Sequence, residues 1–185
     1  MYKRQVFGSE DNITNIKTGE RVIRTTYFLK RRKLQSNPRL NEKPLLAKYK
    51  GREQRRINVI YHEIANQIII EAKKAAVSTV VLENLSNMRR KRSSKALNGR
   101  LSRWSFRKLQ NIIDYKAKLA SLNVKYVDAK NTSSLCLICR GKLSPNEYRL
   151  MICPTCGLEE DRDVIAVKNI LHKYQRDVGA SSVHP

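Results

Sequence analysis

The spacing of apolar side chains predicts three helices along this chain of 185 residues. Between residues 52 and 76 there is no Gly or Pro, and apolar residues recur every three or four positions, which is the period of one helix face. A second helix is predicted from about residue 103 to 121, and a third from about residue 163 to 174. The first face consists of Ile57, Ile60, Tyr61, Ile64, Ile68 and Ala72. The second consists of Phe106, Leu109, Ile113 and Ala120, with Ser102 or Ser105 as N-cap.

Short runs of apolar or β-branched residues predict strands between these helices. Residues 12–16 and 21–27 are predicted to pair as a hairpin around a turn at residues 17–20, because β-branched residues dominate the second run. Residues 77–82 are almost entirely apolar, as in a strand buried on both faces of a central sheet. Residues 124–127 alternate between apolar and polar, which is typical of a half-buried strand.

The charge of the chain gives the strongest indication of the kind of partner it binds. It has 38 Lys and Arg residues against 16 Asp and Glu, so the formal net charge is +22. Such a charge repels itself unless a polyanion binds, and nucleic acid is the commonest polyanionic partner, with a generally basic solvated surface as the alternative. A mean hydropathy of −0.56 and the lack of an apolar run of about 18 residues exclude an integral membrane protein. The first ten residues lack the apolar core of a secretory signal, so we expect a cytoplasmic protein.

Positive charge is concentrated in residues 84–113, which include no acidic residue. We expect this segment to contact phosphates, because Arg and Lys release counterions when they bind a nucleic-acid backbone. Its positive residues are Arg89, Arg90, Lys91, Arg92, Lys95, Arg100, Arg103, Arg107 and Lys108. Trp104 and Phe106 could stack on bases, although packing within the fold is the simpler interpretation. A second basic run at residues 30–33, followed by two prolines, favours a surface loop or a short helix.

The four cysteines form two Cys-x-x-Cys pairs separated by thirteen residues. Zn²⁺ takes four soft or borderline ligands at tetrahedral corners, and each pair supplies two thiolates from one tight turn. Four cysteines leave no position for water, so the predicted site is structural rather than catalytic. Turn residues around the pairs and a strand at residues 148–152 fit a zinc ribbon, while redox dithiols and metal-free thiols are the alternatives. The predicted ligands are Cys136, Cys139, Cys153 and Cys156.

Two carboxylates stand where a catalytic site would need them. Glu83 directly follows the buried run at residues 77–82, and Asp163 stands at the start of the last helix. Carboxylates in such places can hold one or two Mg²⁺ ions, which clamp the attacking and leaving oxygens of a phosphodiester. From spacing alone, a strand-end charge and a helix cap are the simpler interpretations of these two residues.

The order of these motifs resembles the C-terminal half of the TnpB (OrfB) family of transposon-encoded, RNA-guided DNA nucleases, which are related to type V CRISPR effectors. The resemblance covers about residues 12–174 and rests on five segments taken together. They are Val80–Leu85, the basic segment at residues 84–113, Asn131–Cys139, Cys153–Gly157 and Asp161–Ile170. The resemblance implies the α/β class, with an RNase H-like (RuvC) mixed sheet flanked by helices and an inserted zinc ribbon.

The implied organisation is a nuclease core at residues 12–130, a zinc ribbon at residues 131–160 and a final helix at residues 161–174. An unmatched leader at residues 1–11 would precede the core, and a flexible tail at residues 175–185 would follow the helix. Because the N-terminal half of the family's sequences is not matched, we expect the chain to be a fragment of a longer nuclease.

The resemblance also implies which residues are catalytic. Glu83 matches the family's second carboxylate, and Asp163 matches the third, with Asp161 as the less favoured choice. Ile165 stands where family members usually carry Asn, and we expect this difference to perturb the helix start.

The first catalytic aspartate of the family has no counterpart in this sequence. Its position aligns with Phe7, and the nearest acid, Asp11, matches a position beyond the strand. The resemblance thus implies Mg²⁺-dependent DNA cleavage with guide RNA and DNA as partners, and neither a membrane nor a small-molecule substrate. The missing aspartate leaves a non-catalytic DNA- or RNA-binding protein as the alternative. An RNA-binding ribosomal protein, which would have no carboxylate pocket, is a third.

Overall fold

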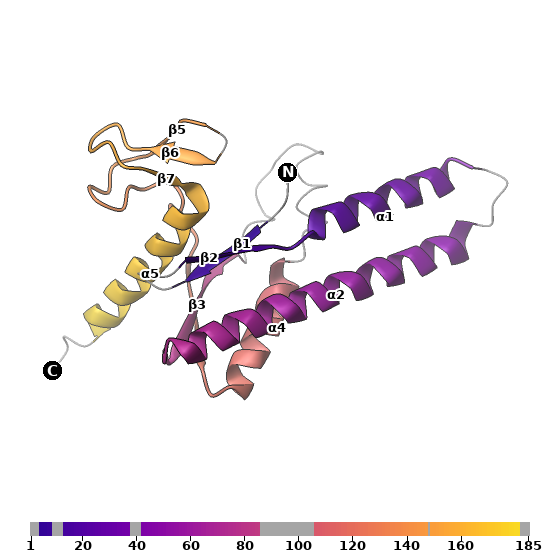
Figure 1. Cartoon of the computed structure of the whole chain (residues 1–185), viewed down its shortest axis with the longest axis horizontal. Helices are drawn as coiled ribbons and strands as arrows, with labels where there is room; N and C mark the ends of the chain where they lie inside the picture. Colours follow the sequence, from indigo (N-terminus) through magenta and orange to yellow (C-terminus); the bar gives the residue numbers. More distant parts are fainter. Residues whose placement is uncertain (1–3, 9–12, 38–41, 86–105, 148, 182–185) are drawn as a thin grey trace. The chain divides into compact units, whose positions relative to one another are not determined.

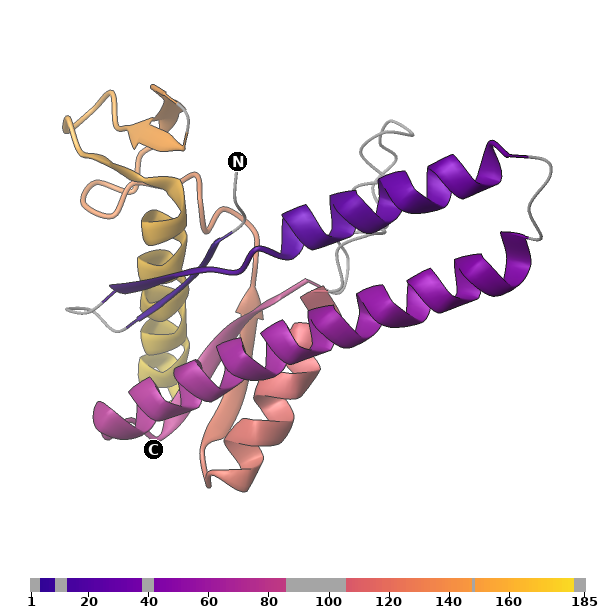
Figure 2. The same ribbon diagram turned by 45° about the vertical axis from the view of Figure 1, so that its right-hand side comes forward.

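The computed structural model describes residues 4–8, 13–37, 42–85, 106–147 and 149–181 (Figures 1 and 2). The chain is of mixed α/β class and divides into two compact units. The first unit contains helices α1 (Glu20–Gln35) and α2 (Glu42–Lys74), together with α4 (Phe106–Leu119) as far as Lys116. The second contains strands β3 to β7 and helix α5 (Arg162–Ser181). Strands β1 (Arg4–Gly8) and β2 (Ile13–Lys17) form a separate two-stranded sheet.

Helix α1 replaces the second strand of the predicted hairpin, so that prediction was wrong for residues 21–27. It rested on β-branched residues, whose strand preference is weak and depends on packing. The helix has its own pattern: Glu20, Arg24, Tyr27 and Arg31 recur every three or four residues on one face, and this face binds α2. The first predicted strand, residues 12–16, corresponds to β2.

The other predicted helices are present, with different bounds. Helix α2 begins ten residues earlier than predicted and passes through Pro44 and Gly51. Pro44 lies in the first turn, where its missing N–H has no intrahelical partner to lose. Gly51 costs a helix about 1 kcal/mol, which a helix of 33 residues tolerates. Helix α5 continues through residues 175–181, where a flexible tail was expected.

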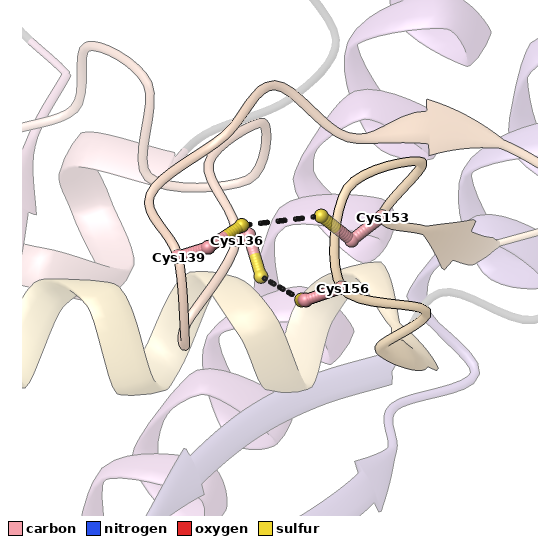
Figure 3. Close-up of side chains that lie close together, drawn as sticks. All are labelled: Cys136, Cys139, Cys153 and Cys156. Carbon is pink, nitrogen blue, oxygen red and sulfur yellow. Dashed lines mark hydrogen bonds between the residues drawn. The ribbon is translucent and has the colours of Figure 1, made fainter.

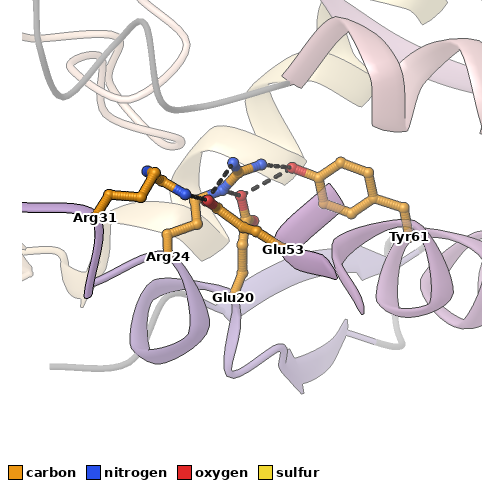
Figure 4. Close-up of polar contacts among 5 residues, drawn as sticks. All are labelled: Glu20, Arg24, Arg31, Glu53 and Tyr61. Carbon is orange, nitrogen blue, oxygen red and sulfur yellow. Dashed lines mark hydrogen bonds and ion pairs between the residues drawn. The ribbon is translucent and has the colours of Figure 1, made fainter. Parts of the chain in front are cut away.

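A mostly buried polar network joins α1 to α2 (Figure 4). The hydroxyl of Tyr61 donates to Oε1 of the fully buried Glu20 at 2.8 Å, and Nε of Arg24 donates to the same oxygen at 2.6 Å. Arg24 also lies 3.6 Å from Glu53, which pairs with Arg31. Burial raises the pKa of the Tyr61 hydroxyl, and the negative charge of Glu20 raises it further, so this phenol stays protonated and donates. Each buried charge in the network therefore has an opposite charge beside it.

We expect Tyr61→Phe to reduce the free energy of unfolding by about 1–3 kcal/mol, because the buried carboxylate of Glu20 loses one of its donors. Tyr49→Phe, on the same helix, is the matched control, since the described contact of Tyr49 with α1 is made by its ring, 6.2 Å from that of Tyr27. Urea denaturation of both variants measures the difference. Equal losses would mean that the Tyr61 hydroxyl adds nothing beyond its ring.

The second unit is built on two parallel strands, β3 (Thr79–Asn84) and β4 (Asn123–Asp128), in register from Thr79 opposite Asn123 to Asn84 opposite Asp128. Helix α5 packs against both strands. The strand prediction for residues 124–127 was correct, and the one for residues 77–82 was shifted by two residues. Residues 79–83 are half-buried rather than buried on both faces, and among the described residues β4 is the only strand paired with β3.

The remaining strands form a small antiparallel sheet, β5 (Ser144–Pro145), β6 (Leu150–Ile152) and β7 (Glu159–Asp161), in the order β5-β6-β7. Strand β7 leads directly into α5. The sheet therefore connects the cysteine pairs to the helix that covers β3 and β4. None of the described helices is both long and apolar enough to cross a membrane.

Candidate metal centre and carboxylate site

The four cysteine sulfurs converge on one point (Figure 3). All four lie within 4.8 Å of one another, with 3.4 Å between Cys136 and Cys156 and between Cys139 and Cys153. A tetrahedral Zn²⁺ with bonds of about 2.3 Å holds its sulfurs ~3.8 Å apart, so the spacing suits that ion. Since all four corners would be thiolates, the arrangement fits a structural site.

The two cysteine turns share one backbone design. In each turn, the N–H of the first cysteine donates at 2.8 Å to the carbonyl oxygen five residues later, and the residue after the second cysteine has a left-handed backbone. The bonded pairs are Cys136 with Gly141 and Cys153 with Leu158, and the left-handed residues are Arg140 (φ 61°) and Gly157 (φ 72°). Gly141 is also constrained, because a Cβ there would lie 3.3 Å from the sulfur of Cys139. In the folded chain these turns direct both sulfurs of each pair toward the same point.

The thiols influence one another's ionisation. The backbone N–H of Cys156 donates to Cys153 and lowers the pKa of that thiol to about 6. The N–H of Leu158 favours ionisation of Cys156, but the three neighbouring sulfurs outweigh it and raise the pKa of Cys156 to about 12. Four thiolates this close repel one another unless a cation lies between them. The donor set therefore fits a dication such as Zn²⁺.

A small apolar core supports the cysteine cluster. Cys136 and Cys153 are buried together with Leu143 and with Ile165 from α5, which is fully buried. The expectation that Ile165 perturbs the helix start was therefore wrong. Helix α5 is unbroken from Arg162, and the Ile165 side chain fills this core.

Glu83 lies in β3, one residue before its end, and its side chain is half-buried. Its Oε1 accepts a hydrogen bond of 2.6 Å from the hydroxyl of Thr132, a buried residue on the loop after β4. A bond this short to a carboxylate is charge-assisted, and such bonds are about twice as strong as neutral ones. Glu83 is thus an oriented carboxylate rather than a freely rotating strand-end charge.

Asp163 lies in the first turn of α5, but it does not cap the helix. The cap is Asp161, whose Oδ1 accepts the N–H of Asp163 at 2.8 Å. The carboxylate of Asp163 instead pairs with Arg149, which precedes β6 and has a φ of 71°. The carbonyl of Arg149 accepts the N–H of Arg162 at 2.8 Å, which ties the arginine to the helix start.

Among the described residues, the cysteines are the one cluster of three or more potential metal ligands, and Glu83 and Asp163 belong to no such cluster. Phe7, which aligns with the expected first aspartate, lies in β1. Of the predicted nucleic-acid contacts, Arg107 and Lys108 are on α4, where Arg107 is exposed and Lys108 is half-buried. The others lie outside the described residues: Arg89, Arg90, Lys91, Arg92, Lys95, Arg100 and Arg103.

Our sequence reasoning missed the extent of a second basic surface, on α1 and α2. Residues 28–56 carry eleven Lys and Arg against two Glu. One of these acids, Glu53, is buried and paired with Arg31. Nine of the basic side chains are exposed, and we call them the basic hairpin surface: Lys30, Arg32, Lys33, Lys43, Lys48, Lys50, Arg52, Arg55 and Arg56. In the sequence, the basic run at residues 30–33 indicated part of this surface. The basic residues of α2 are distant from it in sequence, and only the packing of α1 against α2 brings them together.

A family model and solved protein structures match this fold. A family model described as Cas12f1-like, TNB domain matches residues 106–170, which include β4 and the four cysteines. A solved structure described as the Cas12f1-sgRNA-target DNA complex superposes with a TM-score of 0.67 and 26% identity. It covers 86% of this chain and 43% of that one. A second, of a CRISPR-Cas12f ternary complex, has a TM-score of 0.66 and 24% identity. The fold is thus that of Cas12f-like proteins.

Sequence relatives identify the family. A TnpB-like protein of Methanocaldococcus jannaschii is 44% identical over 163 residues, which are 85% of this chain. The CRISPR-associated endodeoxyribonuclease Cas12f1 of Sulfoacidibacillus thermotolerans is 32% identical over 112 residues. The chain belongs to the TnpB family, which is related to the type V effectors. It spans 58% of the length of the first relative and 25% of the second.

Proposed function

We propose that this chain is the nuclease portion of a TnpB-type, RNA-guided DNA endonuclease, with guide RNA and DNA as its partners. The observation that carries the proposal is the carboxylate of Glu83, which stands near the end of a strand and is oriented by a buried hydroxyl. A charge held in this way costs the fold desolvation and side-chain entropy, which a chemical role explains better than a structural one. The relative named an endodeoxyribonuclease is consistent with it.

Within this proposal, residues 12–130 and 161–174 form an RNase H-like (RuvC) core, and residues 131–160 form a zinc ribbon inserted before α5. Glu83 and Asp163 would hold Mg²⁺, since this ion takes carboxylate oxygens and often only one or two from the protein. When bound, Mg²⁺ stabilises the charge that develops on a phosphodiester during hydrolysis. Cys136, Cys139, Cys153 and Cys156 would hold Zn²⁺ in a structural role, with no contact to the substrate.

The chain's own residues have separate tasks in this proposal. Glu83 would be a ligand of the cation, and Thr132 would keep its carboxylate in place through the hydrogen bond to Oε1. Arg149 pairs with Asp163, and a guanidinium there can bind two oxygens of a phosphate group through two parallel hydrogen bonds. Arg149 would therefore draw the substrate phosphate toward the carboxylates.

Nucleic acid would be held largely by phosphate contacts. The basic hairpin surface supplies such contacts, because its charges are exposed and the nearby Glu53 is already paired with Arg31. Lys48, Arg52 and Arg55 stand three or four residues apart on α2, so they form one stripe of like charge that is unfavourable without a polyanion. Arg107 and the predicted residues between 89 and 103 would add to this binding.

Replacing Lys48, Arg52 and Arg55 together with Gln should lower the slope of log affinity against log salt by about 2–3, because each lost phosphate contact removes ~0.7–0.9. Filter binding of a labelled single-stranded DNA at several salt concentrations measures the slope. The matched control replaces three exposed lysines outside this surface, Lys73, Lys74 and Lys125. If the control triple loses as much slope as the stripe triple, then net charge and not this surface governs binding.

A second candidate function is a DNA- or RNA-binding protein that does not cut. The observation that favours it is the residue at the first carboxylate position, Phe7 in β1, which cannot bind a cation. Both candidates predict salt-sensitive binding, so cleavage separates them. The deciding experiment is Mg²⁺-dependent cleavage of single-stranded DNA by this chain and by its Glu83→Gln variant.

A further inference from the structure

The loop between β4 and the first cysteine pair is held by one face of α5. Nδ2 of the buried Asn169 donates at 2.9 Å to two carbonyl oxygens of this loop, those of Thr132 and Leu135. One turn further along the helix, Nζ of Lys173 donates to the carbonyls of Asp128, at 2.8 Å, and Lys130. Residues four apart lie on one helix face, so these two side chains clamp both ends of the loop.

The clamp is connected to the cysteine cluster. Nη1 of Arg140, the residue after Cys139, donates to Oδ1 of Asn169 at 2.7 Å. This bond fixes which end of the amide faces the loop, because the oxygen is engaged and the nitrogen must donate. Arg140 has a left-handed backbone imposed by the cysteine turn. The orientation of Asn169 therefore depends on that turn being folded.

Thr132, whose carbonyl is bound by Asn169, contacts the carboxylate of Glu83 through its hydroxyl. The Thr132 hydroxyl carries one proton and lies near two acceptors, Oε1 of Glu83 at 2.6 Å and the Ala129 carbonyl at 3.1 Å. The shorter contact, to a charged group, is the stronger one. Thr132 is 3% exposed and its own carbonyl is bound by Asn169, so water cannot replace this donor without moving the loop.

We propose that Thr132 is a positioning residue for Glu83, and that Asn169 and Arg140 extend this support to the cysteine cluster. The proposal rests on the proposed function, in which Glu83 binds the divalent cation. A ligand carboxylate held by an outer partner meets its metal in one orientation, and loss of such a partner typically costs ~10–100-fold in metal affinity or activity. None of the four cysteines needs to approach the reacting phosphate for the cluster to influence it.

The test measures Mn²⁺ binding to the full chain. Electron paramagnetic resonance reports the concentration of free Mn²⁺, and this readout does not require cleavage. We expect Thr132→Val, which keeps the shape and removes the hydroxyl, to weaken the Glu83-dependent site by about 10–100-fold. Thr132→Ser should restore most of the affinity, since it keeps the donor. Ser133→Ala removes a neighbouring hydroxyl and should have no effect. Zinc content and circular dichroism verify that each variant is folded.

The possible outcomes separate this proposal from the proposed function. If Glu83→Gln binds Mn²⁺ as the wild type does, Glu83 is not a ligand, and both proposals are overturned. If Glu83→Gln loses the site while Thr132→Val keeps wild-type affinity, the proposed function stands and the positioning role of Thr132 is rejected. If Thr132→Val and Thr132→Ser lose affinity equally, the hydroxyl is not the cause, which also rejects it.

Discussion

Removing the metal from the cysteine cluster should unfold residues 131–160 while leaving α2 folded. The described strands of this segment have two or three residues each, and its core consists of Cys136, Leu143 and Cys153 packed with Ile165 of α5. So small a core cannot offset the conformational entropy of about thirty residues at ~1–2 kcal/mol each. Zinc modules of this size draw on the order of 10 kcal/mol from the metal.

Hydrogen exchange before and after chelation measures this effect, with the amides of α2 as an internal reference. Elemental analysis of untreated protein should find one Zn²⁺ per chain. The Cys153→Ser variant should behave like the chelated protein, and Ser133→Ala, which changes no ligand, should behave like the wild type. Protein purified without chelator that contains no zinc, or unchanged protection of residues 131–160 after chelation, would contradict the prediction.

Replacing Glu83 with Gln should reduce Mg²⁺-dependent DNA cleavage by more than the ~10–100-fold expected for loss of an outer partner such as Thr132. Gln keeps the size of Glu and can still accept from Thr132, but it lacks the negative charge that binds the cation. Affinity for single-stranded DNA should be unchanged or slightly higher, because an acid has been removed from a basic protein. Single-turnover cleavage over a range of Mg²⁺ concentrations measures the loss.

Glu71→Gln is the control for this experiment, since Glu71 is an exposed acid on α2 that pairs with Lys74. Equal cleavage by wild type and Glu83→Gln would place the chemistry on other acids. Absence of cleavage in both, with nucleic-acid binding intact, would reject the nuclease proposal in favour of the non-catalytic candidate. The Phe7 position makes this a real alternative.

The sequence was most informative where a pattern is local. The period of α2 and the spacing of the four cysteines are both contained in short windows, and the structure agrees with both. The strand prediction at residues 21–27 failed because contacts with a distant segment determine the structure there. Tyr61 and Glu53 of α2 bind Glu20, Arg24 and Arg31, which share one face of α1. Intrinsic strand preference is weaker than such contacts.

In the candidate site, too, the sequence predicted local features but not the contacts between distant residues. Glu83 could be selected by its place after an apolar run, but nothing in the sequence joins it to Thr132, which is 49 residues away. Asn169 was part of a recognised motif, yet its two hydrogen bonds to the loop follow only from how α5 packs. The cap at Asp161 rather than Asp163 also depends on where β7 ends and α5 begins.

The spacing of residues along α5 has a consequence for how the chain can change. Ile165 fills the cysteine core, while Asn169 and Lys173 hold the loop after β4, and the three are four residues apart. One residue inserted between Ile165 and Asn169 would rotate the rest of the helix by about 100° and advance it by about 1.5 Å. Either the core or the loop would then lose its partner. The number of residues between Ile165 and Lys173 is therefore fixed by the two contacts, and this stretch of α5 tolerates substitutions more easily than insertions or deletions.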